Sequence, residues 1–346
     1  MDNRKSFFSN FIHSKEALSV IALGLLLLFN LFFTPGFFSI NINDGHLYGA
    51  IIDIFKNGAP LMLVSAGMTL VMATGGTDIS VGSVAALTAV ATTMFYEGFK
   101  TSNGEIKLPM AAAVLIGLLI GVVCGLINGI LVAKLKVQPF ITTLMMQSAA
   151  RGIAYIISNG KVISVHGSEY KFFGSGYVIG IPVSIIIVLA IIAILAIFIR
   201  KTSYGLFLES IGTNRVSSYF SGITVDAIIL SVFVISGLMA GIGGFLTSSN
   251  ISAADTNTTG VYMELDAIMA CVLGGNSMKG GRFSLLGSFL GAIIVRTLTL
   301  TIYMKGAPSE TIVLYKALVL ALVGIIQTVN LGSLWKKIRR DKPEVV

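Results

Sequence analysis

The sequence predicts an all-α integral membrane protein with about ten transmembrane helices, some of them short or interrupted. Three observations lead to this fold class: 55% of the 346 residues are hydrophobic, only 12% are charged, and uncharged apolar runs recur along the whole chain. Soluble domains carry about 25% charged residues. The low charge therefore indicates an integral membrane protein rather than a soluble one.

Candidate spans follow from the length of the apolar runs, since a helix needs about 20 mostly apolar residues to cross a membrane. The segments lie at approximately 17–34, 58–74, 79–95, 110–133, 139–158, 180–199, 226–247, 263–275, 283–304 and 312–329. The second, third and eighth are short, which indicates interrupted or tilted helices. The first follows basic residues as in a signal peptide, but no small-residue cleavage site follows it, so we expect a retained span.

The distribution of Lys and Arg predicts the orientation in the cell membrane. With a cytoplasmic N-terminus, fifteen of the 24 basic residues fall in cytoplasmic segments, six fall outside, and Arg151, Arg296 and Lys316 lie within spans. Both termini are then cytoplasmic, as an even number of spans requires. We expect one domain, 1–346, with a cytoplasmic N-terminal segment (1–16), a cytoplasmic connection (200–225) and a basic tail (330–346).

A polar, glycine-rich break at 74–83 separates the second and third apolar runs. Such breaks expose backbone to a cavity in transporter helices. An Asp this deep in apolar sequence is a functional-site hypothesis; the alternative is a tight turn with an Asp that caps the next helix. The candidates for a translocation path here are Gly75, Gly76, Thr77, Asp78 and Ser80. A second break of similar type, 274–282, contains Asn276.

Two polar residues lie in the fifth candidate span. Gln147 and Arg151 are four residues apart and so share one helix face. We expect that face to meet the protein interior or a watery cavity, with snorkelling of Arg151 to an interface as the alternative.

The fourth candidate span has a glycine at every fourth position. Gly117, Gly121, Gly125 and Gly129 form a row on one face of the helix. A neighbouring helix can approach such a face closely. We expect tight helix packing there.

The cytoplasmic connection 200–225 mixes apolar and polar residues in a pattern that predicts a short amphipathic helix. The apolar side of such a helix must be covered by a partner protein or by the lipid interface.

Several functions are excluded by what the sequence lacks. No phosphate-binding GxxxxGK[ST] stretch, catalytic triad or HExxH motif occurs, and the three histidines are too far apart for a metal cluster. Basic residues do not form a patch typical of nucleic-acid binding, and the two cysteines lie in apolar runs as packing residues. We therefore expect no enzyme, no metal site and no cofactor in this chain.

These motifs resemble those of a known family. Residues 75–83 (GGTDISVGS) are similar to the GGIDLSVGS signature of permease subunits from bacterial ribose, xylose and galactose ABC importers. The similarity continues at 128–132, 138–144, 204–214, 264–268 and 274–277 and covers about residues 50–330. Residues 44–49 and 280–286 are most similar to galactofuranose importer permeases. Thr77, Ile79 and the Arg282–Phe283 pair depart from the usual pattern, which leaves the sugar open.

The resemblance implies half of a translocation path for a monosaccharide, galactofuranose or a related pentose or hexose. It adds Asn128 to the path candidates, and it implies that an ABC ATPase docks on Tyr204, Gly205, Leu206, Phe207, Glu209, Gly212 and Asn214. The implied partners are that ATPase with its ATP and Mg²⁺, a second identical or related permease, and an extracytoplasmic sugar-binding protein. The alternative is an ion-coupled secondary transporter of a small polar solute with Asp78 as its coupling carboxylate. Few other acidic residues lie within the spans to form an ion relay.

Overall fold

The computed structural model describes residues 15–43, 45–101 and 104–328. Most of the predicted N-terminal segment and the whole basic tail, 330–346, lie outside the described residues. The described part is mostly helical. Its helices are α2 (Lys15–Phe33), α3 (Ala50–Ala73), α4 (Val81–Glu97), α5 (Met110–Ala133), α6 (Pro139–Ser158), α7 (Ser168–Ser175), α8 (Val183–Lys201), α9 (Tyr204–Thr213), α10 (Arg215–Phe220), α11 (Val225–Ile251), α12 (Met263–Leu273), α13 (Leu285–Met304) and α14 (Ser309–Thr328).

Long apolar runs become helices because a helix satisfies its own backbone hydrogen bonds, which lipid cannot do. Within the described residues, six helices are long and apolar enough to cross a membrane: α3, α5, α6, α8, α11 and α13. Helix α3 begins at Ala50, well before the predicted start near residue 58. Helix α12 has 11 residues, about 16 Å at 1.5 Å per residue. It is too short to cross alone, in agreement with the short eighth segment.

The cytoplasmic connection contains two short helices where the sequence predicted one. Helices α9 and α10 are separated at Asn214. The Asn214 side chain accepts a hydrogen bond from the Ser217 backbone N–H at 2.9 Å and so caps α10. The amphipathic pattern did not predict this interruption.

Short strands are the part of the fold that the all-α prediction missed. The described part of the chain forms four antiparallel pairs: β1 (Asn41–Asn43) with β2 (His46–Tyr48), β3 (Phe99–Thr101) with β4 (Gly104–Ile106), β5 (Ile163–Ser164) with β8 (Ala253–Ala254), and β6 (Tyr177–Val178) with β7 (Ile181–Pro182). Strands of two or three residues are too short to show an alternating pattern in the sequence.

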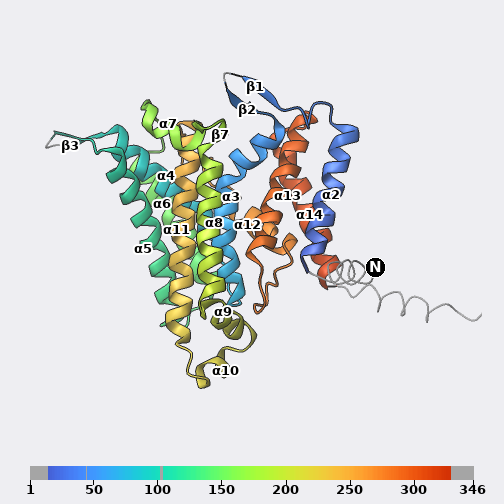
Figure 1. Cartoon of the computed structure of the whole chain (residues 1–346). Helices are drawn as coiled ribbons and strands as arrows, with labels where there is room; N and C mark the ends of the chain where they lie inside the picture. Colours follow the sequence, from blue (N-terminus) through green and yellow to red (C-terminus); the bar gives the residue numbers. More distant parts are fainter. Residues whose placement is uncertain (1–14, 44, 102–103, 329–346) are drawn as a thin grey trace, which may run out of the picture.

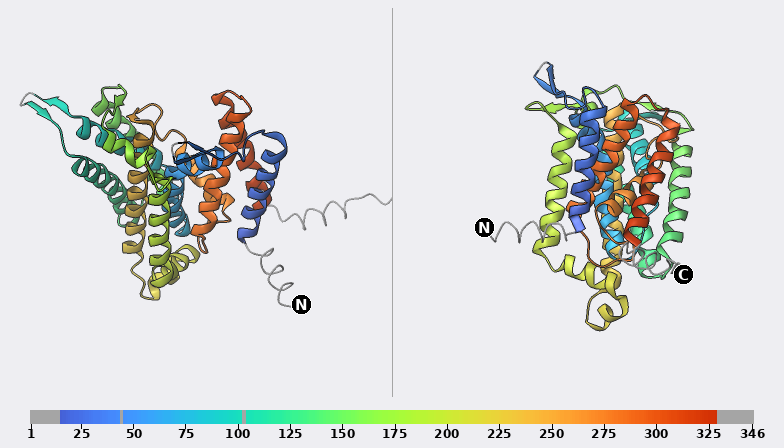
Figure 2. Two further views of the ribbon diagram at one scale, coloured as in Figure 1. Left: turned by 45° about the horizontal axis from the view of Figure 1, so that its top comes forward. Right: turned by 90° about the vertical axis from the view of Figure 1, so that its right-hand side faces the viewer.

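The long helices run side by side, and the short elements collect at their two ends. Strands β1–β3, β7 and helix α7 lie at one end, and α9 and α10 lie at the other (Figure 1). The β1–β2 hairpin projects beyond the helices at the end opposite α9 and α10 (Figure 2). The core lies around α3, whose residues from Gly58 to Ala73 are all buried.

Candidate functional site

The first glycine-rich break has a defined backbone geometry. The Gly75 N–H donates to the Met72 carbonyl at 2.9 Å, and the Gly76 N–H donates to the Val71 carbonyl at 3.1 Å. This pair of bonds is a Schellman motif, which ends a helix by turning one residue into the left-handed region. Gly75 is that residue, with φ of +79°. The glycine at this position therefore ends α3 without strain.

The second break repeats this geometry at the end of α12. The Gly275 N–H donates to the Val272 carbonyl at 3.0 Å, the Asn276 N–H donates to the Cys271 carbonyl at 3.0 Å, and φ of Gly275 is +82°. Gly275 is thus the structural equivalent of Gly75. The sequence showed two breaks of one type but no register between them, and this register comes from the structure.

The hydrogen bonds of Asp78 and Ser80 link the first break to α4, α5 and α11. Its Oδ1 accepts hydrogen bonds from the Ser80 N–H at 3.0 Å and the Ser80 Oγ at 2.6 Å, while its Oδ2 accepts from Ser236 Oγ of α11 at 2.8 Å. Ser80 Oγ also accepts from Asn128 Nδ2 of α5 at 3.0 Å. The Asp78 side chain is only 1% exposed. Both carboxylate oxygens are engaged. The bond from the Ser80 N–H to Asp78, two residues earlier, closes a turn just before α4, whose N-cap residue is Ser80 and has no side-chain capping bond.

Asn276 has the corresponding position in the second break. Its Oδ1 accepts from the Ser284 N–H at 2.7 Å, and its Nδ2 donates to Ser288 Oγ of α13 at 2.6 Å. Thr69 Oγ1 of α3 donates to the same Ser288 Oγ at 2.5 Å. The second break is therefore linked by buried side chains to α3 and α13.

Helix α9 meets both breaks at one point. The Gly281 N–H donates to the Ala73 carbonyl at 3.0 Å, and a methyl group at Gly212 of α9 would overlap both of those atoms. A methyl group at Gly280 would lie 2.8 Å from the Gly75 nitrogen and 3.0 Å from the Gly212 Cα. We call Gly75, Gly212, Gly280 and Gly281 the glycine junction. Backbone of three segments touches there because none of these residues has a side chain.

The remaining docking candidates lie on α9 and at its ends. Tyr204 anchors the helix to α11, since its hydroxyl shares a hydrogen bond of 2.8 Å with Ser231 Oγ. Burial raises the pKa of the Tyr204 phenol, which further favours the neutral, hydrogen-bonded form. Gly205 lies against Ile199 at the end of α8, Phe207 is half-buried, and Leu206 is 65% exposed.

A hollow opens beside the exposed Leu206. It has a volume of about 400 Å³, and its lining includes Leu206, Glu209, Asn214 and Arg282. Arg282 belongs to the second break, so the hollow combines α9 with the segment that α9 contacts at the glycine junction.

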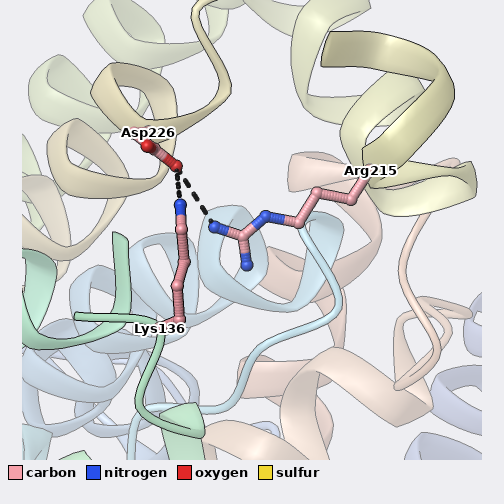
Figure 3. A network of polar contacts seen from close by, with 3 residues as sticks. All are labelled: Lys136, Arg215 and Asp226. Carbon is pink, nitrogen blue, oxygen red and sulfur yellow. Dashed lines mark hydrogen bonds and ion pairs between the residues drawn. The ribbon is translucent and has the colours of Figure 1, made fainter. Parts of the chain in front are cut away.

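An ion-pair network holds the neighbouring connection (Figure 3). Asp226 at the start of α11 pairs with Lys136 and with Arg215 Nη2 of α10 at 3.4 Å. All three side chains are about half exposed. Exposed ion pairs contribute only about 0–1 kcal/mol each, so this network positions the connections more than it stabilises the fold.

The two polar residues of α6 contact the first turn of α12 and the segment before it. Arg151 Nη1 donates to the carbonyls of Thr256 and Thr259, each at 2.7 Å. Gln147 Nε2 donates to Glu264 Oε1 at 3.2 Å. The Arg151 guanidinium is thus bonded to backbone carbonyls of the segment that precedes α12.

The glycine row of α5 lies against two helices. A methyl group at Gly125 would overlap the Phe233 carbonyl of α11, one at Gly121 would lie 2.6 Å from the Gly237 carbonyl, and one at Gly129 would lie 3.0 Å from Leu230. Gly117 instead lies against the Thr92 side chain of α4. Backbone contact along this face is possible only because the row has no side chains.

A cavity of about 500 Å³ lies between α3, α11, α12, α13 and α14. Its lining includes the Asp266–Lys316 ion pair, 2.6 Å long, together with Arg296 and two asparagines, Asn57 and Asn250. The sequence placed Arg296 and Lys316 within spans but did not select them as site residues. Their charge inside apolar runs was the signal that could have found this site.

Three hydroxyl side chains that bond the two breaks could not be identified from the sequence. Ser236, Thr69 and Ser288 bond the two breaks, but Ser and Thr are frequent in membrane helices, where they bond their own backbone. Only their positions opposite Asp78 and Asn276 identify them, and those positions depend on how the helices pack.

Comparison with known proteins assigns the chain to a family. A family model described as "Branched-chain amino acid transport system / permease component" matches residues 50–326. The galactofuranose transporter permease protein YtfT of Escherichia coli K12 is 39% identical over 325 residues, with 93% of each chain covered. No solved structure matches.

Two further relatives have similar coverage. The fructose import permease protein FruF of Bifidobacterium longum is 34% identical over 97% of this chain and 94% of its own. The ribose import permease protein RbsC of Haemophilus influenzae is 34% identical over 92% of this chain and 94% of its own. With this coverage and the apolar helices described above, the chain belongs to the permease components of ABC importers and is a multi-pass cell-membrane translocation subunit, not an enzyme.

Proposed function

We propose that this chain is the permease subunit of an ATP-driven sugar importer and forms half of the translocation path for a monosaccharide, galactofuranose or a related pentose or hexose. The glycine junction carries the mechanistic part of the proposal. It joins the short helix α9, whose Leu206 is exposed, to the backbone of both helix breaks. The names of the relatives, which are permeases for galactofuranose, fructose and ribose, support the substrate class.

We further propose ten membrane-crossing segments, formed by α2–α6, α8 and α11–α14. The fifteen-to-six distribution of Lys and Arg favours a cytoplasmic location for the end that carries α9 and α10. The end with the β1–β2 hairpin then faces outward. Both termini are cytoplasmic, and the chain is one domain, 1–346, with the connection 200–225 exposed to the cytoplasm.

We place the ATPase on this connection, at Tyr204, Gly205, Leu206, Phe207, Glu209, Gly212 and Asn214. The hollow of about 400 Å³ and the exposed Leu206 support this position, because the apolar side of an amphipathic helix needs a covering partner. The permease family carries no cofactor of its own, and ATP and Mg²⁺ belong to the ATPase. A second permease and an external sugar-binding protein complete the assembly.

In this proposal the path candidates gather at the two breaks and on α6. Gly75, Gly76, Thr77, Asp78, Ser80 and Asn128 surround the first break, and Asn276 lies in the second. Gln147 and Arg151 lie on α6, which contacts the first break through the hydrogen bond from Thr143 Oγ1 to the Thr77 carbonyl, 3.3 Å long. Movement of α9 would reach both breaks through the glycine junction. ATP and the loaded binding protein would then each favour one conformation of the permease pair.

The test is purification of the tagged chain in mild detergent, with mass spectrometry of the proteins that co-purify, followed by uptake in proteoliposomes. We expect an ATPase subunit in the complex and ATP-dependent uptake of radiolabelled D-ribose, D-fructose or D-galactose. Uptake without ATP that collapses with an ionophore would replace the proposal with the ion-coupled alternative. Uptake of L-leucine but of none of the sugars would overturn the substrate class.

A further inference from the structure

The cavity of about 500 Å³ lies in the part of the helices nearest the β1–β2 hairpin. Its lining comes from the early turns of α3 (Asn57), the last turns of α11 (Thr247 and Asn250) and the second half of α13 (Arg296 and Tyr303). The volume is within the range of about 300–1,000 Å³ that small-molecule sites occupy. In the orientation proposed above, this is the outer half of one subunit.

The charges around the cavity balance. Lys316 pairs with Asp266 at 2.6 Å, and both side chains are about one-fifth exposed. No carboxylate of the described residues lies within 4 Å of the Arg296 guanidinium, but Asp53 and Asp266 both interact with it electrostatically. Arg296, Lys316 and Asp266 line the cavity, and Asp53 is an exposed residue outside the lining. Because Asp266 and Asp53 together offset the field of Arg296, the cavity favours a neutral ligand over an anion.

The asparagine pair leaves hydrogen-bonding groups unused. Asn250 Nδ2 donates to Asn57 Oδ1 at 2.6 Å. No bond within the described residues occupies the two donors of Asn57 Nδ2 or the acceptor Asn250 Oδ1, and the Arg296 guanidinium adds up to five further donors. A polyhydroxyl ligand needs donors and acceptors side by side, because each hydroxyl both donates and accepts.

Two aromatic rings also line the cavity. Tyr262, which precedes α12, and Tyr303, near the end of α13, are each about half exposed. A ring offers a flat apolar face to the C–H groups of a sugar, while the polar groups described above bond its hydroxyls. Apolar and aromatic lining with a few placed polar groups is the usual composition of a small-molecule site.

We infer that this cavity binds one neutral monosaccharide within a single permease subunit, with its hydroxyls on Arg296, Asn57 and Asn250. The inference rests on the proposed function and adds to it a holding site on the outer side of the two breaks. The sugar would stop there after leaving the external binding protein and before the breaks move.

The test measures binding of tritiated D-ribose, D-fructose and D-galactose to the purified full-length chain in lipid nanodiscs, without ATP or binding protein. One of these sugars should be the one that the assembled importer transports. We expect that sugar to bind the nanodisc-embedded chain saturably. The variants Asn57→Leu and Asn250→Leu should weaken this binding at least 10-fold. The matched control is Asn41→Leu, an exposed position on β1, which should bind within twofold of the natural chain.

A second readout does not depend on how well the leucine variants fold. Thr247→Cys places a thiol at the cavity wall with little change in volume, and both natural cysteines are buried. We expect the transported sugar to slow modification of this thiol by a small charged methanethiosulfonate reagent at least fivefold. D-galacturonate at the same concentration should protect it less than the neutral sugar does.

The outcomes separate this inference from the proposed function. If the complex imports a sugar with ATP but that sugar neither binds the nanodisc-embedded chain nor protects Thr247→Cys, the cavity is not a sugar site and the importer proposal stands. Stronger protection by D-galacturonate would overturn the neutral ligand class. If no sugar is imported by the complete assembly, the proposed function itself fails.

Discussion

Gly212 of α9 lies directly against the carbonyl oxygen of Ala73, the last residue of α3, with no room for a methyl group between them. The same carbonyl accepts the hydrogen bond from Gly281 N–H of the second break. One backbone oxygen thus connects the helix proposed to receive the ATPase with both interrupted regions of the permease. Contact through backbone alone is stiff, because no flexible side chain intervenes.

The first prediction concerns this contact. Gly212→Ala forces α9 away from the Ala73 carbonyl, at a cost of about 1–3 kcal/mol typical of overpacking. We expect ATP-driven uptake to fall by about 10-fold or more, while ATP hydrolysis by the complex continues. Parallel assays of uptake and phosphate release in proteoliposomes measure both. Gly24→Ala on α2, where a methyl group meets no atom within 4 Å, is the control, and equal uptake by the two variants would show that the junction does not couple the subunits.

The second prediction concerns the packing of α5 on α11. A methyl group at Gly125 overlaps the Phe233 carbonyl, so Gly125→Ala should lower the free energy of unfolding by about 1–3 kcal/mol. Gly152→Ala on α6 meets no atom within 4 Å and should be neutral or stabilising by up to about 1 kcal/mol, because alanine favours helix over glycine. Thermal unfolding in detergent compares the two. A lower melting temperature for Gly152→Ala than for Gly125→Ala would contradict the packing argument.

The third prediction distinguishes two roles of Asp78. Asp78→Ala leaves the donors of Ser80 and Ser236 without their acceptor, at about 1–3 kcal/mol for each buried unsatisfied group. Because Asp78 is also a path candidate, we expect uptake to fall further than membrane abundance, and Ser236→Ala to have a smaller effect on both. Immunoblots of membranes alongside uptake assays measure this. A proportional loss of abundance and uptake in Asp78→Ala would mean that the carboxylate only holds the break together.

The fourth prediction concerns the network in Figure 3. Asp226→Asn removes the charge that Lys136 and Arg215 share. Because these side chains are about half exposed and two pairs are lost, we expect a loss of less than about 2 kcal/mol in the free energy of unfolding. The difference from the natural chain should also shrink as salt rises from 0.05 to about 1 M, where charges are screened within about 3 Å. A larger loss that salt does not change would indicate a buried structural role.

The sequence was sufficient for features that depend on composition and short spacing. Apolar runs located most helices, since lipid leaves a helix as the simplest way to satisfy the backbone. A glycine every four residues placed Gly117–Gly129 on one face, and the glycine-rich breaks were visible at 74–83 and 274–282. The motif at 75–83 also identified the family that the comparisons then established.

Only the tertiary structure decided which of these features touch. Nothing local connects Gly212 with Ala73, Asp78 with Ser236, or Asp266 with Lys316, because each pair is brought together by helices far apart in the chain. The shared Schellman geometry of Gly75 and Gly275 is likewise set by φ and by hydrogen bonds, not by residue type alone. Apolar side chains determine that helices form and pack, but close backbone contacts and pairs of polar side chains depend on the one arrangement in which the helices fit.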